Sequence, residues 1–392
     1  MSRFVLLILV LMLSACSSLK FWESDVSAGK GDDETVQAAQ LQDFDAQVKL
    51  IKLWRTGIGK GQQSHEASLI PTVTAEVVYA ATREGKVAAL DKHNGDVLWR
   101  VDLDTLLTGG VGVGGGVVVV GNNNGEVIAL NADSGEERWR AALSSEILSS
   151  PGANASVVVV QTQDAKLVGL SISSGDKLWQ YETDVPVLSL RGTAAPLVLD
   201  TMVVSGFANG KLVALEPVSG SVLWEARVAI PKGRTELERM VDVSTPVLYN
   251  DVIYASSYQG RTGAYSRGNG RELWGQAYSS HVSPGYGLGQ VYVVDDTDRV
   301  QALRGNSGQV LWSNDKLTLR NLSAPLALGG AIALTDAEGY LHLLSQTDGT
   351  FVARTKVDGD GVSVPMAGDG DTLYVLDNSG NLSAYSIKDE EL

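Results

Sequence analysis

The stretch GKVAALDKHNGDVLWR, residues 85–100, decides the fold of this chain. Six further copies begin at residues 125, 165, 210, 260, 298 and 339, and an eighth copy, from residue 380, is cut short by the C-terminus. Each copy has two runs of alternating apolar residues around a turn centred on glycine, which is typical of a β-hairpin. Repetition at roughly 40 residues, with four short strands per unit, predicts a β-propeller.

The spacing of two markers predicts how the propeller closes. A marker that is mostly proline opens each unit, and it precedes the tryptophan position by 28 residues in all seven complete units, as from Pro71 to Trp99. Applied to Pro365, this offset places the next tryptophan one residue beyond Leu392. Trp54 is left over before the first opener, so we expect its strand to become the outer strand of the last blade. Joining both ends in one blade removes the open edges of the ring.

The predicted fold class is therefore all-β: an eight-bladed β-propeller of four-stranded antiparallel blades, closed by the N-terminal strand. The tryptophan positions of the seven complete units are Trp99, Trp139, Trp179, Trp224, Trp274 and Trp312, with Ala353 in the seventh place. Because equivalent positions recur around a ring, we interpret these tryptophans as packing between neighbouring blades rather than as a ligand site.

The first residues have the features of an export signal. Arg3 precedes an apolar run, residues 4–13, which is too short to span a membrane and ends at Leu13-Ser14-Ala15-Cys16. This end resembles the lipobox of bacterial lipoproteins, which implies cleavage before Cys16 and lipid attachment to its sulfur. The alternative is an ordinary secretory signal with an incidental cysteine. Cys16 is the only cysteine of the chain and stands at the motif position, which favours the lipoprotein.

The expected domain organisation follows from these features. Residues 1–15 are a lipoprotein signal peptide, residues 16–46 a lipidated N-terminus with an acidic, flexible tether, and residues 47–392 the propeller. By resemblance to lipoproteins of Gram-negative bacteria, a serine after the cysteine, here Ser17, implies sorting to the outer membrane, with the protein facing the periplasm.

Composition argues against several functions. The formal net charge is −15 and no cluster of Lys or Arg interrupts it, which disfavours nucleic acid and anionic membrane surfaces as partners. The four histidines lie far apart in different units, and neither a GxSxG nor an HExxH motif occurs. We therefore expect no metal, no cofactor and no catalytic residue.

One enzyme family resembles part of the chain. Residues 89–99, ALDKHNGDVLW, match the A-x-D-x-x-x-G-x-x-x-W pattern of the pyrroloquinoline-quinone dehydrogenases, which are also eight-bladed propellers. Only this copy keeps the aspartate, Asp91. Members of that family are considerably longer, and many stack the quinone against a vicinal disulfide that a chain with one cysteine cannot form. We interpret the match as shared blade packing, and a periplasmic enzyme of this type remains the alternative function.

Two long connections between blades are the candidate binding site. The distance from the tryptophan position to the next opener is 17 residues after Trp179 and 22 after Trp224, against 10 to 13 at five other junctions and 17 after Trp54. The two long connections are consecutive, so we expect residues 180–195 and 225–245 to lie side by side on one face. Irregular loops on a regular scaffold commonly carry function.

Each connection has a distinctive sequence. The first contains Leu188-Ser189-Leu190-Arg191, in which strand spacing would direct both leucines the same way, as apolar anchors beside an arginine. Alternatively, both leucines are tucked under the loop. The second contains Thr235 and, three residues later, Glu238, a pattern typical of a capping box and hence of a helical turn. The alternative there is a solvated charged insertion.

The lipobox, the acidic tether, the eight repeats, the LSLRG loop and the following ERMVDV loop together resemble the BamB family, the lipoproteins of the outer-membrane β-barrel assembly (BAM) complex. The resemblance covers essentially the full chain. It implies a non-enzymatic scaffold that binds the periplasmic POTRA domains of BamA and assists the folding and insertion of outer-membrane proteins. The residues that the resemblance implies for partner binding are Leu188, Leu190, Arg191, Arg239 and Asp242. Where the family often has a second acidic residue, this chain differs and has Ser244, which carries no carboxylate.

Unfolded outer-membrane proteins are a further partner that this function predicts. Exposed outer strands of the blades could receive their strands by β-augmentation.

Overall fold

The computed structural model describes residues 37–61, 67–191 and 194–389. The expected signal peptide, Cys16 and most of the expected tether lie outside these residues. Within the described part of the chain every regular element is a β-strand, and no helix there is long and apolar enough to cross a membrane. Residues 38–392 form one compact unit.

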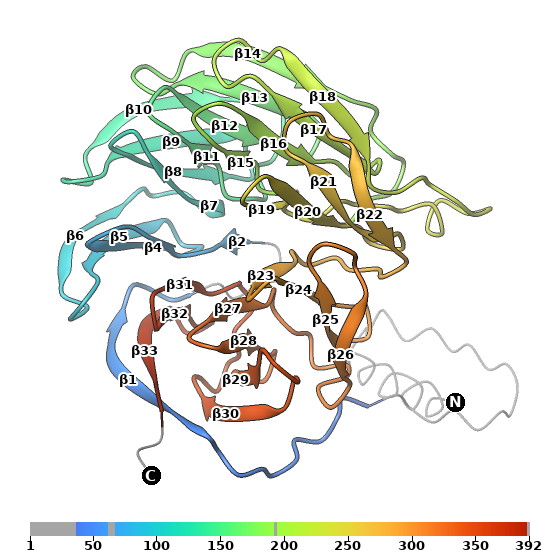
Figure 1. Ribbon diagram of the computed structural model, residues 1–392. Helices are drawn as coiled ribbons and strands as arrows, with labels where there is room; N and C mark the ends of the chain where they lie inside the picture. The colour runs from blue at the N-terminus through green and yellow to red at the C-terminus, as the bar shows by residue number, and fades with distance from the viewer. Residues whose placement is uncertain (1–36, 62–66, 192–193, 390–392) are drawn as a thin grey trace, which may run out of the picture. The chain divides into compact units, whose positions relative to one another are not determined.

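Eight antiparallel blades confirm the predicted fold class (Figure 1). Their strands are listed here from the innermost to the outermost. Blade one has β3 (Thr72–Val73), β4 (Val77–Ala81), β5 (Lys86–Asp91) and β6 (Val97–Asp102); blade two has β7 (Leu107–Gly114), β8 (Val117–Asn122), β9 (Glu126–Asn131) and β10 (Glu137–Ala142). Blade three has β11 (Gly152–Ala153), β12 (Val157–Gln161), β13 (Lys166–Ser171) and β14 (Lys177–Glu182); blade four has β15 (Leu197–Val198), β16 (Val203–Gly206), β17 (Lys211–Leu215) and β18 (Val222–Arg227).

The other four blades repeat this order. Blade five has β19 (Val247–Tyr249), β20 (Val252–Ser256), β21 (Thr262–Ser266) and β22 (Glu272–Gln276); blade six has β23 (Gly285–Gly287), β24 (Gln290–Val294), β25 (Val300–Arg304) and β26 (Val310–Asn314). Blade seven has β27 (Leu326–Leu328), β28 (Ala331–Thr335), β29 (Tyr340–Ser345) and β30 (Phe351–Lys356); blade eight has β31 (Ala367–Asp369), β32 (Thr372–Leu376), β33 (Asn381–Asp389) and β1 (Val48–Gly57). A short strand, β2 (Ser68–Leu69), pairs parallel with β7.

The N-terminal strand closes the ring, as the spacing of the markers predicts. β1 pairs antiparallel with β33 from Val48 opposite Asp389 to Gly57 opposite Asn381. Figure 1 shows the two strands side by side, β1 in blue and β33 in red. The pairing satisfies backbone hydrogen-bonding groups along the outer edge of β33, and β1 becomes the outermost strand of blade eight.

The repeated tryptophans pack between blades, which confirms their structural role. Each ring lies against the glycine of the hairpin turn in the next blade; a Cβ on Gly95 would come within 2.6 Å of the Trp54 ring. Each indole N–H donates to a backbone carbonyl in that same blade, at 2.8–3.1 Å. The pairs are Trp54–Gly95, Trp99–Gly135, Trp139–Gly175, Trp179–Gly220, Trp224–Gly270, Trp274–Gly308 and Trp312–Gly349.

This pairing explains why Ala353 takes the tryptophan position in blade seven. The blade that follows it is the composite one, in which β33 and β1 come from opposite ends of the chain. No hairpin turn joins those two strands, so no turn glycine is present to receive an indole. Ala353 is nevertheless only 3% exposed, within a cluster formed with blade eight.

The first described residues differ from the flexible tether predicted for them. Residues 38–46, expected to be part of a flexible tether, instead pack on the propeller, where Leu41 and Phe44 contact the apolar cluster formed by blades six and seven. The physical reason is that this stretch has spaced apolar residues within a polar sequence, which is enough to bind a preformed apolar surface.

Candidate functional site

The two long connections lie side by side, as their consecutive lengths predict. The first is residues 183–196, between β14 and β15; the second is residues 228–246, between β18 and β19. Two hydrogen bonds join them: Leu190 N–H donates to Asp242 Oδ1 at 3.0 Å, and Ala195 N–H donates to the hydroxyl of Thr245 at 2.9 Å. We call these the first and second long loops.

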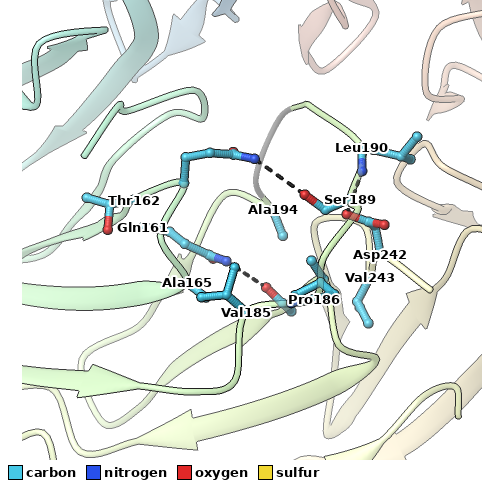
Figure 2. Close-up of a pocket in the computed structure, with 13 residues that line it drawn as sticks. Gln161, Thr162, Ala165, Val185, Pro186, Ser189, Leu190, Ala194, Asp242 and Val243 are labelled. Carbon is cyan, nitrogen blue, oxygen red and sulfur yellow. Dashed lines mark hydrogen bonds between the residues drawn. The ribbon is translucent and has the colours of Figure 1, made fainter. Parts of the chain in front are cut away.

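The first long loop is not a strand, so the expectation that its two leucines face the same way is wrong. Leu188 is 46% exposed, whereas Leu190 is half-buried and lines a small cavity of about 30 Å³ between the loops. Figure 2 shows the Leu190 amide directed at the carboxylate of Asp242. On the other side of the cavity, Gln163 Nε2 donates to the hydroxyl of Ser189 at 3.5 Å. The hydrogen bond from its amide to Asp242 holds Leu190 against the second long loop, whereas Leu188 remains exposed.

Exposed apolar residues extend the candidate site beyond Leu188. Val187 is 77% exposed and Val185 57%, and the second long loop adds Ile230 at 61% and Leu237 at 60%. Large apolar side chains this exposed on adjacent loops are typical of a surface that is covered in a complex. Sequence reasoning missed them because apolar residues in a loop carry no periodicity from which exposure can be inferred.

Arg191 is held by a neighbour from a third connection. Its guanidinium Nη2 lies 3.2 Å from both carboxylate oxygens of Glu146, in the loop between β10 and β11. The Arg191 side chain remains 53% exposed. The pair therefore positions a cation without removing it from solvent, and sequence spacing gave no signal for Glu146.

Asp242 is the most buried of the expected binding residues, at 8% exposed. Burial raises the pKa of its carboxyl to about 7, against the opposing effect of the Leu190 amide. Its second oxygen, Oδ2, is buried without a hydrogen-bond partner among the described residues. This geometry allows Asp242 to act on the conformation of the first long loop.

The other expected positions also belong to the second long loop, one on each side of Asp242. Arg239 is exposed, in a turn over residues 236–239. The predicted capping box precedes it: Glu238 N–H donates to Thr235 Oγ1 at 3.2 Å, and Thr235 N–H donates to Glu238 Oε2 at 3.3 Å. Ser244 is buried, and its hydroxyl donates to the carbonyl of Ser256 at 3.2 Å, so this residue serves the fold of the loop.

Within residues 37–61, 67–191 and 194–389, no set of three or more His, Cys, Asp or Glu side chains has a metal-binding arrangement. The Asp91 of the quinoprotein-like motif accepts hydrogen bonds from the backbone of His93 and Asn94, which is the role of a turn residue.

Comparison with known proteins gives a consistent result. Residues 83–314 and 299–392 match the family model described as outer membrane protein assembly factor BamB. A curated BamB of Pseudomonas aeruginosa is 51% identical over 364 residues, which cover 93% of this chain and 96% of the relative. The crystal structure of BamB from Moraxella catarrhalis superposes with a TM-score of 0.79 at 29% identity, covering 86% of this chain and 100% of that one.

A quinohemoprotein alcohol dehydrogenase from Comamonas testosteroni is also similar in structure, with a TM-score of 0.67 at 14% identity, covering 86% of this chain and 76% of that enzyme. A likeness at this identity shows a common propeller fold alone. The family model and the 51% identity over nearly the whole length of both chains are specific by contrast. The chain belongs to the BamB family of outer-membrane protein assembly factors.

Proposed function

We propose that this chain is a non-enzymatic scaffold of the outer-membrane protein assembly machinery. It binds the periplasmic POTRA domains of BamA through the two long loops, and so assists the folding and insertion of β-barrel outer-membrane proteins. The observation that carries the proposal is the surface of the first long loop, where exposed apolar side chains lie beside an exposed arginine. Hydrogen bonds to both neighbouring connections hold this loop in position.

The chemistry of this surface suits a protein partner. Val187 and Leu188 offer apolar area whose removal from water supplies affinity, and Arg191 offers directed hydrogen bonds to carboxylates or carbonyls. Because Glu146 and Asp242 already restrain the loop, little conformational entropy remains to be lost on binding. A preorganised site of this kind is what an adaptor needs to hold a flexible arm in one orientation.

The proposed location follows from the N-terminal motif. Lipid attached to Cys16 would anchor the protein to the outer membrane, facing the periplasm, where it can meet the periplasmic domains of BamA. The description of the family as an outer membrane protein assembly factor supports the same compartment.

The test is charge reversal at Arg191. Arg191→Glu would place a carboxylate beside Glu146 and remove the cation from the surface; we expect binding to purified BamA periplasmic domains to fall about 100-fold or more, as for a binding hot spot. Arg271→Glu is the matched control. Arg271 is exposed and immediately precedes the outermost strand β22, whereas the two long loops follow the ends of the outermost strands β14 and β18. Unchanged binding by Arg191→Glu, measured by titration calorimetry, would overturn the proposed site.

A further inference from the structure

The segment before β1, residues 38–47, lies along blade seven and is held there at both ends. Ala39 N–H donates to the carbonyl of Thr318 at 2.9 Å, and Gln47 N–H donates to the carbonyl of Val352 at 2.8 Å. Between these points Leu41 and Phe44 are half-buried against the apolar cluster of blades six and seven. We call this segment the strap.

Two arginines donate hydrogen bonds to the strap backbone: Arg320, from the connection before blade seven, and Arg354, from β30 of blade seven. Arg320 Nη1 donates to the carbonyl of Ala39 at 2.9 Å, and Arg354 Nη1 donates to the carbonyl of Gln42 at 2.9 Å. The Arg354 guanidinium also lies 5.0 Å from the ring centres of Phe44 and Phe351. Those two rings are stacked, with centroids 5.3 Å apart.

One buried carboxylate orders both arginines. Asp336 Oδ2 accepts from Arg320 Nε at 2.7 Å and lies 2.9 Å from His342 Nε2. Arg354 Nε lies 3.1 Å from the other ring nitrogen, His342 Nδ1. Asp336 and His342 are completely buried, so the arrangement is isolated from water.

This geometry defines the protonation state of His342. Arg354 Nε–H can only donate, so Nδ1 must accept, and the ring proton sits on Nε2, where it donates to Asp336. A second proton on Nδ1 would point at the N–H of Arg354. It would also put an imidazolium against a guanidinium, so the contact that holds Arg354 under the strap would become repulsive.

The surrounding charges do not relieve this conflict. The charged and titratable groups around the ring are Asp336, Arg320, Arg354 and Tyr340, and around those Glu338, Lys356 and Asp43. Asp336 is already shared with Arg320. Burial, together with the two arginines and against the effect of Asp336, lowers the pKa of His342 below its ordinary value near 6.5, in the direction that the single ring proton required by the hydrogen bonds implies.

We propose that the strap is an acid-released latch: protonation of His342 displaces Arg354 and frees residues 38–47 from blade seven. Release exposes the ring to water, so opening is coupled to the uptake of one proton. Below pH 6.5, and down to the lower pKa of the closed form, the population of the open strap then rises by up to about tenfold per pH unit.

Release would lengthen the chain ahead of the propeller by ten residues, or roughly 34 Å when extended. If the released segment serves as a longer tether to the membrane, that role rests on the proposed lipid anchor. The latch itself does not depend on the anchor. The two ideas therefore fail separately.

Hydrogen exchange of the full chain between pH 7.5 and 5.5, corrected for the intrinsic pH dependence of exchange, tests the latch. We expect peptides covering residues 38–47 to lose protection as pH falls below 6.5, while the β12 strand of blade three stays protected. His342→Gln, which cannot gain a charge, should remove this pH dependence. The matched control, His281→Gln, removes a partly exposed histidine near Asp296 and should retain it.

Flat exchange of the strap in the wild-type protein, or pH dependence that persists in a folded His342→Gln, would overturn the proposal. A second measurement avoids dependence on that variant. In the wild-type protein with ¹⁵N-labelled histidine, we expect His342 to be protonated on Nε2 alone at neutral pH. Its protonation midpoint should coincide with strap opening; a ring that titrates while the strap stays closed would also refute the latch.

Discussion

The backbone amide of Leu190 donates a hydrogen bond to the carboxylate of Asp242 at 3.0 Å, across 52 residues of sequence. This bond joins the two consecutive long loops of the propeller beside the cavity that Leu190 lines, two residues from the exposed Leu188. The acidic residue of the second long loop thereby acts on the shape of the first. It can influence partner binding without touching the partner.

Two substitutions separate positioning from direct contact. Asp242→Asn keeps an oxygen acceptor for the Leu190 amide, so we expect binding to the BamA periplasmic domains to stay within about threefold of wild type. Asp242→Ala leaves that amide unpaired, at a cost of about 1–3 kcal/mol, and should weaken binding about tenfold or more. Equal losses in calorimetric titrations of the two variants would instead indicate that the charge contacts the partner.

The same residue predicts a pH dependence of stability. The pKa of Asp242 is about 7 in the folded protein against an ordinary 3.8, so the folded state holds its proton more tightly. This carboxyl therefore favours folding at low pH and costs stability as pH rises from 3.8 to 7, with an upper limit of about 4 kcal/mol. In urea unfolding, Asp242→Asn should be more stable than wild type at pH 8, and the difference should shrink at pH 5. A less stable Asp242→Asn at pH 8 would contradict this.

Ring closure should depend on Trp54. This ring is 8% exposed, packs on Gly95 and donates to the carbonyl of Lys92 at 3.1 Å. We expect Trp54→Ala to lower the free energy of unfolding by about 3–5 kcal/mol, because it empties a large volume between blades one and eight. Trp54→Phe, which keeps most of the packing, should cost less in the same thermal or urea unfolding experiment. Similar losses for both would mean that the indole hydrogen bond, not the packing, dominates.

The buried charges of blade seven should matter for stability at neutral pH. The Asp336 side chain is completely buried and the Arg320 side chain is 4% exposed, so Asp336→Asn would leave this cation with only the exposed carboxylate of Glu338 as a counter-charge. We expect a loss of about 3 kcal/mol. Glu338→Gln is the control: it pairs with the same arginine, but its side chain is 59% exposed, so its removal should cost less than about 1 kcal/mol. The free energies of unfolding of both variants can be measured in urea at pH 7.5. Equal losses in the two variants would contradict the prediction that burial decides the effect.

Several details of the site could be predicted because they are local. The capping box between Thr235 and Glu238 follows from two residues three apart, and the structure forms both of its hydrogen bonds. The loop lengths identified the paired connections, since consecutive blades must place their connections on one face. Arg191 and Glu146, by contrast, are 45 residues apart in sequence, and no pattern in either loop indicates their contact.

The sequence by itself determined the fold: the period of the hairpins, the offset from opener to tryptophan, and the unassigned Trp54 predicted eight blades and their closure. These signals can be recognised in the sequence because each blade repeats the same short-range pattern and packs on its neighbours in the same way. Only the tertiary structure decided that Leu188 is exposed whereas Leu190 is half-buried, and that the strap binds to blade seven. It also supplied the reason why Ala353 stands at a tryptophan position. Each depends on which residues from distant parts of the chain meet in space. The burial of Asp242 and the lack of a hairpin turn between β33 and β1 follow from the assembled ring, not from any local pattern in the sequence.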